Sequence, residues 1–373
     1  MKYYLIAGEA SGDLHASNLI KAIKRSDPDA VFRAFGGDLM EQAGAELYLH
    51  YREVALMGIV EVVTKLPTIR KHKNECRLDI LRWKPDVLIL IDYSGFNLPM
   101  ARFAHKNNIT VIYYISPKLW AWAQWRVNSV RRFVKKMFVI LPFEVDFYKQ
   151  HDVLVEYYGN PVLDSVTEYE NKIALIRDSR NYTKGKPIVA LLAGSRKQEI
   201  SALLPEMLSV VHKFPGYHFI IAGAPSIPPE YYKEFIKDNQ VDIVYNDTYN
   251  LLKQSVAAIV TSGTATLETA LFMVPEVVVY KTNPVTLFLG RFLVKVKYFS
   301  LVNLILDKVA VKELLQKDLS ADITEELNRI LNDIEYREKM LSDFRMLREM
   351  LGQPGVADRV ATRIYQIIKS SQA

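Results

Sequence analysis

The sequence contains little of what most metal and redox sites require. Cys76 is the only cysteine in 373 residues, so the chain can form neither an internal disulfide nor a zinc site built from several thiolates. The seven histidines form no His-x-His or His-Glu-x-x-His pattern, and we predict no metal site. A Gly-x-Gly-x-x-Gly fingerprint and a Gly-x-Ser-x-Gly elbow are also missing. Their absence argues against a nicotinamide cofactor and an α/β-hydrolase, and we predict no cofactor.

Long hydrophobic runs are absent as well. No window reaches the roughly 18 uncharged apolar residues of a membrane-spanning helix, and the apolar stretch behind Met1 is too short for a signal peptide. A net charge of +6 is compatible with nucleic acid, an anionic membrane surface or phosphorylated substrates. No zinc-finger or RNP-like pattern occurs, so nucleic acid is not a predicted partner. We expect a cytoplasmic or peripheral protein.

Short β-branched runs alternate with helical patterns along most of the chain, and several of these runs are apolar throughout. Such strands are buried on both faces, which indicates parallel sheets covered by helices. The predicted strands are residues 3–7, 31–35, 87–91, 110–115, 137–141 and 154–158 in the first half, and 188–192, 217–221, 241–245, 257–260 and 276–280 in the second. After about Val309 we expect helices only.

A polar, Lys- and Asn-rich stretch, Glu168 to Lys186, interrupts the alternation and is interpreted as a linker. It separates residues 1–165 from residues 186–350, and two α/β units of similar size suggest two Rossmann-like domains facing an interdomain cleft. A last helix at about 355–373 is predicted to pack back on the first domain. Because ligands of open α/β sheets bind beyond the carboxyl ends of the strands, functional residues are expected in the strand-to-helix loops.

Two loops of the first half carry candidate residues. The small residues of Gly8–Asp13 allow a ligand to approach the backbone and the next helix N-terminus, and its candidates for substrate contacts are Glu9, Ser11 and Gly12. Asp92 ends the apolar strand 87–91 and is a candidate general base for an attacking hydroxyl. A tight turn with an N-cap, and an aspartate that caps the following helix, are the structural alternatives.

Two loops of the second half are candidates for a nucleotide-diphosphate site. In the first, backbone N–H groups of Gly194 and Ser195 can face a phosphate, and Arg196 can bind it with two hydrogen bonds. In the second, small and hydroxyl residues can surround a pyrophosphate, and Glu268 can accept hydrogen bonds from ribose hydroxyls. The candidate residues of this second loop are Ser262, Gly263, Thr264, Ala265 and Glu268. Each loop taken alone is also a common helix cap.

Three apolar segments edged by basic residues are candidates for contact with a lipid or an anionic membrane surface. They lie within residues 57–69, 120–136 and 287–306. Core packing is the alternative for each of them. The residues selected are Ile59, Val62, Val63, Leu66, Ile69, Trp120, Trp122 and Phe292.

The ordered set of loops resembles one family, the lipid A disaccharide synthases of glycosyltransferase family 19, over nearly the whole chain. The matching motifs are Gly-Glu-Ala-Ser-Gly-Asp at 8–13, Met-Gly-Ile-Val-Glu-Val at 57–62, Ile91-Asp92, Ser116-Pro117 before Trp120-Ala-Trp122, Leu-Pro-Phe-Glu at 141–144, Tyr-Gly-Asn-Pro at 158–161, Gly-Ser-Arg at 194–196, Ser-Gly-Thr-Ala at 262–265 with Glu268, Ser-Leu-Val-Asn-Leu at 300–304 and Val-Lys-Glu-Leu-Leu at 311–315.

The resemblance implies a GT-B fold with the donor on the second domain. It implies transfer from UDP-2,3-diacylglucosamine to 2,3-diacylglucosamine 1-phosphate (lipid X), giving the β(1→6) disaccharide 1-phosphate and UDP without a metal ion. It also implies that Asp92 is the essential acid and that Arg196 contacts the donor. Asn303 lies in a family motif and is a further candidate for substrate contact in the cleft. Members are peripheral on the cytoplasmic face of the bacterial inner membrane, and they can pair as homodimers through exchanged C-terminal parts.

The chain departs from the family pattern after Asp92, where many members read Asp-x-Pro-Asp-Phe-Asn and this chain has Gly95 in place of the second Asp. All acid–base work is therefore assigned to Asp92, with Arg196 and the helix behind residues 262–264 stabilising charge on the departing UDP. Two rival functions remain, a UDP-sugar epimerase of the same fold and a non-catalytic lipid- or nucleotide-binding regulator. The first needs no acyl pocket, and the second releases no UDP.

Overall fold

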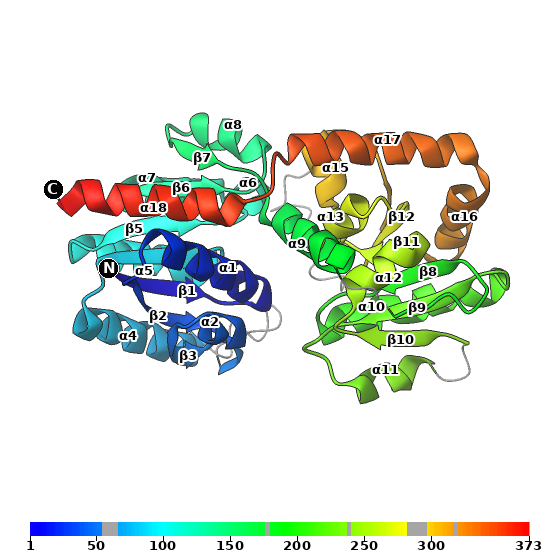
Figure 1. Cartoon of the computed structure of the whole chain (residues 1–373), viewed down its shortest axis with the longest axis horizontal. Helices are drawn as coiled ribbons and strands as arrows, with labels where there is room; N and C mark the ends of the chain where they lie inside the picture. The colour runs from blue at the N-terminus through cyan, green and yellow to red at the C-terminus, as the bar shows by residue number, and fades with distance from the viewer. Residues whose placement is uncertain (54–65, 176–179, 237–239, 282–296, 316–318, 373) are drawn as a thin grey trace. The chain divides into compact units, whose positions relative to one another are not determined.

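The computed structural model describes residues 1–53, 66–175, 180–236, 240–281, 297–315 and 319–372. Contacts divide the chain into two compact units, Met1–Pro161 together with Gln353–Ala373, and Val162–Gly352. Each unit is built on one parallel sheet covered by helices (Figure 1). The predicted α/β class is thereby confirmed.

The sheet of the first unit has seven described strands in the order β3-β2-β1-β4-β5-β6-β7. The strands are β1 Lys2–Ala7, β2 Val31–Gly36, β3 Glu46–His50, β4 Val87–Ile91, β5 Thr110–Tyr114, β6 Lys136–Val139 and β7 Val155–Tyr157. The described helices are α1 Ala10–Ser26, α2 Asp38–Gln42, α4 Leu66–Trp83, α5 Ser94–Lys106, α6 Leu119–Trp122, α7 Val127–Phe133, α8 Phe143–Lys149 and α18 Val356–Gln372, with short 3-10 turns at η1 Tyr51–Glu53 and η2 Gln124–Arg126.

Strand β1 shows why these runs are apolar at every position. Tyr3 and Leu5 belong to the hydrophobic cluster on one face of the sheet, whereas Tyr4 and Ile6 belong to the cluster on the other face. All four side chains are fully buried. Since side chains alternate along a strand, a sheet covered on both faces needs apolar residues at both parities.

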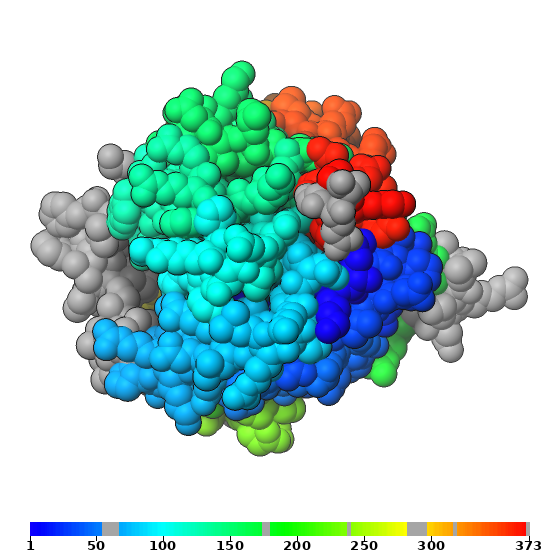
Figure 2. Space-filling view, turned by 90° about the vertical axis from the view of Figure 1, so that its left-hand side faces the viewer, coloured from blue at the N-terminus to red at the C-terminus, as the bar shows by residue number. Residues whose placement is uncertain are grey.

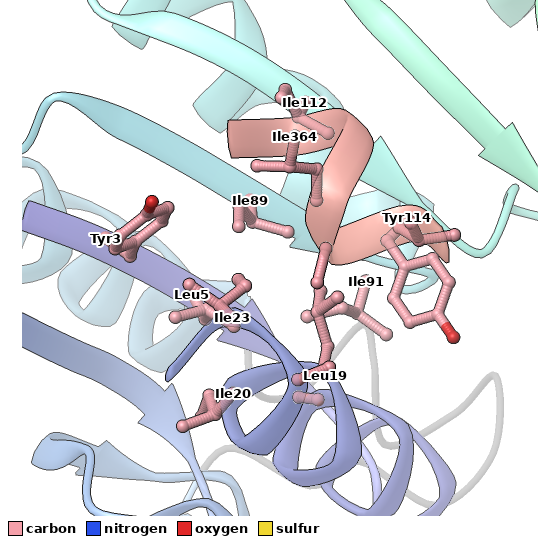
Figure 3. Packing of buried hydrophobic residues seen from close by; sticks show 14 of the residues in the cluster. Tyr3, Leu5, Leu19, Ile20, Ile23, Ile89, Ile91, Ile112, Tyr114 and Ile364 are labelled. Atoms are coloured by element: carbon pink, nitrogen blue, oxygen red, sulfur yellow. The ribbon is translucent and has the colours of Figure 1, made fainter. Parts of the chain in front are cut away.

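The C-terminal helix α18 belongs to the first unit and packs along α1. Ile364 of α18 lies among Ile89, Ile91 and Ile112 of the central strands (Figure 3). In the space-filling view the red end of the chain lies beside the dark-blue N-terminal segment (Figure 2). Residues more than 300 positions apart in the sequence thus complete one hydrophobic cluster.

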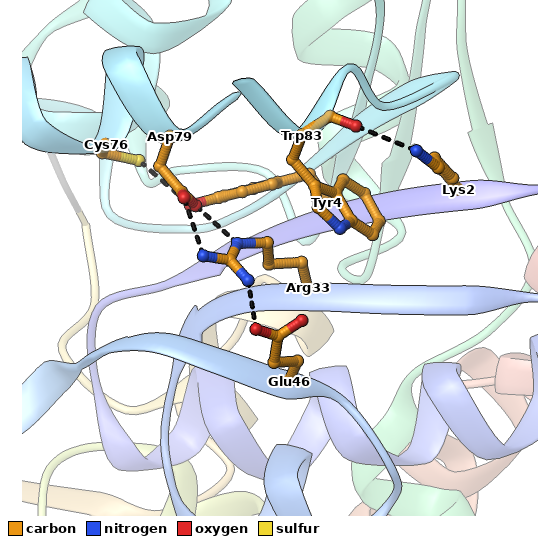
Figure 4. Close-up of polar contacts among 7 residues, drawn as sticks. All are labelled: Lys2, Tyr4, Arg33, Glu46, Cys76, Asp79 and Trp83. Carbon is orange, nitrogen blue, oxygen red and sulfur yellow. Dashed lines mark hydrogen bonds and ion pairs between the residues drawn. The ribbon is translucent and has the colours of Figure 1, made fainter. Parts of the chain in front are cut away.

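A polar network fastens α4 to the edge of the first sheet (Figure 4). Arg33 of β2 donates two hydrogen bonds of 2.8 Å to the carboxylate of Asp79, and the Tyr4 hydroxyl donates a third, of 2.9 Å, to the same carboxylate. Arg33 also pairs with Glu46 of β3. The network links α4 to three adjacent strands, and Tyr4, Arg33 and Asp79 are mostly removed from solvent, whereas Glu46 is exposed.

The sheet of the second unit has six described strands in the order β10-β9-β8-β11-β12-β13. The strands are β8 Ile188–Leu192, β9 His218–Gly223, β10 Asp242–Tyr245, β11 Ser255–Thr261, β12 Glu276–Tyr280 and β13 Lys312–Leu315. The described helices are α9 Pro161–Leu175, α10 Lys197–Leu208, α11 Pro229–Ile236, α12 Thr248–Gln254, α13 Thr264–Leu271, α15 Leu301–Leu306, α16 Leu319–Asn332 and α17 Ile334–Met350, with a 3-10 turn at η3 Val211–Lys213.

Two expectations about the chain path were wrong. Helix α9 runs through Leu175, so the start of the expected linker at Glu168 is helical: Val162 and Val166 are buried, and Tyr169 packs on aromatic rings of the second unit. Apolar residues at helical spacing outweighed the polar composition. The residues after Val309 also do not form helices only, because Lys312–Leu315 form β13, a short edge strand. Its two polar residues hide the apolar pattern of a buried strand.

Removing the Asp79 carboxylate should destabilise the first unit strongly. In Asp79→Ala the mostly buried Arg33 loses its two-bond partner, and loss of one member of a buried pair typically costs about 3–5 kcal/mol. Denaturant unfolding followed by circular dichroism measures the change. The control is Asp358→Ala, which breaks the exposed pair with Arg25 and should change stability by about 0–1 kcal/mol. Equal small effects in both variants would contradict a structural role for the network.

Candidate active site

Asp92 lies on a strained turn at the carboxyl end of β4. Asp92 and Tyr93 both adopt the left-handed conformation, with φ of 42° and 46°, which costs of order 1–3 kcal/mol for each non-glycine residue. The buried Asn97 amide donates to the carbonyls of Asp92 (2.9 Å) and Ile91 (3.0 Å), and the Tyr113 hydroxyl also donates to the Asp92 carbonyl. Tyr93, not Asp92, occupies the N-cap of α5. Asp92 therefore does not serve as the helix cap that was the structural alternative.

The Asp92 carboxylate has an unusual electrostatic environment. Burial raises its pKa to about 6, from 3.8 for an ordinary aspartate; the Lys118 ammonium opposes the shift, and the Glu9 carboxylate adds to it. A hydrogen bond from the Tyr93 backbone N–H also favours the ionised form. A carboxylate with a pKa near 6 is a stronger base than an exposed one and is still mostly ionised at neutral pH.

The loop at Gly8–Asp13 lies beside the Asp92 turn because β1 and β4 are adjacent strands. A Cβ at Gly8 would lie 2.2 Å from the Tyr93 ring, and one at Gly12 would lie 3.3 Å from the Ala7 Cβ. Glycine at these two positions allows the turn and α1 to approach closely. Glu9 and Ser11 are exposed at this edge, so the structure gathers the predicted residues of the first unit around Asp92.

Sequence reasoning assigned no role to two buried carboxylates near these loops. Asp13 accepts hydrogen bonds from the backbone N–H groups of Gly37, Leu39 and Met40 at 3.0–3.1 Å, and so holds the start of α2. Glu144 accepts from the Trp120 indole (3.2 Å) and from two backbone N–H groups of the preceding turn. An acid within a loop motif was the available signal, but the partners of Asp13 and the indole that donates to Glu144 come from other segments.

In the second unit, the turn after β8 already binds a carboxylate. The backbone N–H groups of Ser195 and Arg196 donate to Glu199 Oε2 at 3.0 and 3.3 Å, and the Arg196 guanidinium lies 3.3 Å from Glu199 Oε1. Gly194 has φ 110°, which allows this close approach. In this structure the Glu199 side chain occupies these N–H groups, and their contact with a phosphate stays a prediction.

The second predicted loop follows β11, the neighbour of β8 in the sheet. The Ser262 hydroxyl donates to the Phe299 carbonyl at 2.7 Å. Gly263 has φ 154° and open space where a Cβ would lie. Thr264 and Ala265 are the first residues of α13, where backbone N–H groups lack partners within the helix. Both predicted loops thus end at the same edge of this sheet.

Glu268 lies one turn further along α13. The Tyr249 hydroxyl of α12 donates to its Oε1 at 2.7 Å, and burial raises the pKa of the Glu268 carboxyl. The hydrogen bond from Tyr249 favours the ionised form and limits the shift. Tyr249 was not selected from the sequence, because a tyrosine in a short helix carries no local signal of this contact.

Asn303 was expected to contact substrate, and the structure gives it a different role. Its Oδ1 accepts from the N–H groups of Ala310 (2.8 Å) and Val311 (3.0 Å), while its Nδ2 donates to the Val311 carbonyl and to Glu313 Oε1, each at 2.9 Å. The amide group is buried and its two donors and two acceptor positions are used. Asn303 thus ties α15 to β13, and its contact with substrate stays a prediction.

The residues selected for lipid contact divide into three groups. Ile59, Val62, Val63, Phe292 and the side chain of Leu66 lie outside the described residues. Ile69 is half-buried and packs against the core of the first unit, so core packing explains it. Trp120 is half-buried. Trp122 is 40% exposed and makes a T-shaped ring contact with Trp125, which is 63% exposed.

The described residues contain no group of three or more His, Cys, Asp or Glu side chains arranged to hold a metal ion. In the same part of the chain, every helix is too short or too polar to traverse a bilayer.

Known structures with the same fold define the class of this protein. It is similar to a UDP-GlcNAc 2-epimerase of Neisseria meningitidis bound to UDP-GlcNAc (TM-score 0.67, 13% identity, covering 94% of this chain and 99% of the other). It is also similar to the glycotransferase of kitacinnamycin (TM-score 0.59, 14% identity, 98% of each chain). At such identities the likeness concerns the fold alone. The protein is of the GT-B class, as predicted.

The chain belongs to the lipid-A-disaccharide synthase family. The family model for LpxB, lipid-A-disaccharide synthetase, matches residues 3–356. The lipid-A-disaccharide synthase of Geobacter sulfurreducens is 36% identical over 371 residues, which are 98% of this chain and 96% of the relative. That of Myxococcus xanthus is 37% identical over 371 residues, 98% and 97% of the two chains. The resemblance inferred from the loop motifs is confirmed.

The raised pKa of Asp92 should be visible in the pH dependence of stability. Because its pKa is higher in the folded protein, the folded state binds the proton more tightly; this contribution is present below pH 3.8 and is lost as pH rises to about 6. Asp92→Asn should therefore remove part of the decline in unfolding free energy across that window. Denaturant unfolding at a series of pH values measures it. Identical pH profiles for the two proteins would contradict the burial of this carboxylate.

Proposed function

We propose that the protein is the glycosyltransferase that joins UDP-2,3-diacylglucosamine to 2,3-diacylglucosamine 1-phosphate, forming the β(1→6) disaccharide 1-phosphate and UDP. Membership of the lipid-A-disaccharide synthase family supports the reaction. The assignment of Asp92 as the base rests on one observation. Its carboxylate has a raised pKa and lies on a turn held by Asn97 and Tyr113. Strained residues of this kind cluster at active sites.

The transfer is written as a single displacement with inversion. The Asp92 carboxylate takes the proton of the acceptor 6-hydroxyl, and the oxygen forms a bond to the anomeric carbon of the donor. The bond from that carbon to the diphosphate oxygen breaks, and its electron pair leaves with UDP. Positive charge develops on the donor ring, as in other glycosyl transfers. A base whose pKa lies near the working pH suits the first of these events.

The second unit is the proposed donor site. The turn after β8 binds the anionic Glu199 carboxylate through two backbone N–H groups and Arg196, and the diphosphate would replace that carboxylate. The N-terminus of α13, behind Ser262, Gly263 and Thr264, adds a positive dipole end at the same sheet edge. Glu268, held by Tyr249, is proposed to accept from the ribose hydroxyls.

We also propose that the protein works on the cytoplasmic face of the inner membrane, attached to an anionic surface. Both substrates carry acyl chains, so access to a lipid surface is a chemical requirement. The exposed rings of Trp122 and Trp125 support this proposal, with the Arg126 guanidinium 4.9 Å from the centre of the Trp122 ring. Indoles beside cations favour the membrane–water interface.

The test of the function is a mass-spectrometric assay with purified protein and both substrates. Formation of the acylated disaccharide 1-phosphate together with UDP is expected. The donor supplied alone should stay unchanged, whereas an epimerase of this fold would convert it without an acceptor. Tight UDP binding with no product from either substrate mixture would favour a regulator and contradict the proposal.

Replacing the base should slow the reaction without changing the affinity for the donor nucleotide. Asp92→Asn keeps the side-chain size but cannot take a proton, and loss of a positioned general base typically costs about 10²–10⁴-fold in rate. Initial rates and UDP affinity by calorimetry are the measurements. The matched control is Asp152→Asn, since Asp152 also has a left-handed backbone (φ 55°) but an exposed side chain. Near-normal turnover in Asp92→Asn would defeat the assignment.

Removing the Glu268 carboxylate should weaken donor binding. Glu268→Ala is expected to lower UDP affinity by about 10- to 100-fold, as for loss of hydrogen bonds to a charged group, and Tyr249→Phe should lower it less. Calorimetric titration with UDP measures both. Glu325→Ala, at an exposed position of the same unit, is the control. Unchanged UDP affinity in Glu268→Ala would remove this residue from the proposed site.

A further inference from the structure

Three cations of the first unit lie near one another where α4 packs on α5, the helix that follows Asp92. Lys73 of α4 donates from its Nζ to the Gly95 carbonyl at 2.8 Å and lies 5.7 Å from the centre of the Phe96 ring. Arg77 follows one turn later on α4, with its guanidinium 5.5 Å from the Phe103 ring of α5. Arg126 lies at the end of η2, beside α7. We refer to Lys73, Arg77 and Arg126 as the cation cluster.

The charges of the cation cluster are not neutralised by carboxylates in the described part of the chain. The pKa of Lys73 is lowered by burial and further by the positive charges of Arg77 and Arg126, and no negative group is among the causes. Within the described residues the Arg77 Nε is buried without a hydrogen-bond partner. Half-buried cations elsewhere in this unit do have carboxylates, such as Lys136 with Glu156 at 2.6 Å. Three like charges gathered in one place favour an anionic ligand.

Space for a ligand exists beside Lys73, at Gly95. Gly95 is exposed, and nothing lies within 4 Å of where its Cβ would be. Gly95 is three residues from Asp92, so the two Cα atoms are at most about 11 Å apart. The Lys118 charge also acts on the Asp92 carboxylate. A sugar whose hydroxyl reaches Asp92 would therefore hold its opposite end near the cluster.

We propose that Lys73, Arg77 and Arg126 form the binding site for the phosphate monoester of the acceptor, one sugar ring away from the hydroxyl that Asp92 deprotonates. The inference rests on the proposed function. A phosphate monoester carries about −1.5 to −2 charges near neutral pH and three acceptor oxygens. Two guanidinium groups and an ammonium match that charge and that number of oxygens. The cluster thus gives the enzyme a way to prefer a phosphorylated acceptor.

The kinetic test compares two acceptors, 2,3-diacylglucosamine 1-phosphate and the same lipid with a 1-O-methyl group in place of phosphate. Wild-type protein in neutral detergent micelles should prefer the phosphorylated lipid. Lys73→Met should raise KM for that lipid by about 10- to 150-fold and leave KM for the donor and the reaction of the methyl glycoside unchanged. Arg126→Gln should act in the same direction, and Lys73→Arg should restore most of the preference.

Lys71→Met is the matched control. Lys71 lies on the same helix two residues earlier, is exposed, and is 3.8 Å from Glu75. Its replacement removes one positive charge from α4 and should leave both acceptors unaffected. An equal loss on both acceptors in Lys73→Met would mean that Lys73 only supports the α5 turn through Gly95, and would overturn the inference, as would unchanged kinetics in Lys73→Met and Arg126→Gln.

Lipid binding without donor separates this inference from the proposed function. Quenching of tryptophan fluorescence should show tighter binding of the phosphorylated lipid than of the methyl glycoside, and the difference should vanish in Lys73→Met. If this holds while wild-type protein forms no disaccharide, the proposed function fails and the phosphate site stands. No difference in wild-type protein overturns the site.

A last comparison concerns bilayer phosphates as the alternative ligand. Sedimentation with phosphatidylcholine vesicles containing phosphatidylglycerol measures attachment to an anionic surface. The inference predicts equal attachment of wild-type protein and Lys73→Met. Loss of attachment in Lys73→Met with unchanged acceptor KM would assign the cluster to the bilayer instead.

Discussion

The turn that follows β4 is the constraint on which the first unit's site depends. Strand β4 is buried on both faces, so a polar side chain can be accommodated only after the strand ends at Ile91. The chain turns there through two consecutive left-handed residues, and the buried Asn97 and Tyr113 hold that unfavourable backbone by binding the Asp92 carbonyl. Because side chains of the core hold this backbone, the fold itself sets the position from which the Asp92 carboxylate extends.

The neighbouring glycines follow from the same constraint. Tyr93 can pack beside β1 only because Gly8 has no Cβ, and α1 can start close to the sheet because Gly12 has none. Asp13 then fastens α2 through three backbone N–H groups. The motif Gly8–Asp13 thus combines space for the Asp92 turn with a structural carboxylate. Its spacing has a physical reason beyond ligand contact.

Burial alone does not distinguish the acids of this chain; their neighbours do. Burial raises the pKa of Asp92, Glu144 and Glu268 alike. Glu144 is held by backbone N–H groups and an indole, and Glu268 by a tyrosine hydroxyl. Asp92 is the one of these three whose shift is opposed by a cation, Lys118. A cation beside a buried acid keeps the ionised form accessible near neutral pH, as a base requires.

The sequence by itself determined the class of fold and the positions of the candidate loops, because both depend on local patterns. Runs apolar at every position indicated parallel strands, and small or polar residues directly after them indicated the loops at Gly8, Asp92, Gly194 and Ser262. Contacts between separate elements were decided only by the tertiary structure: the packing of Tyr169 on Tyr249 where a linker was expected, the saturated amide of Asn303, the Tyr249 hydroxyl on Glu268, and the Lys73 ammonium on the Gly95 carbonyl. Helical and strand periods are visible in a few neighbouring residues, whereas hydrogen-bond partners and neighbouring charges are set by how separate elements pack.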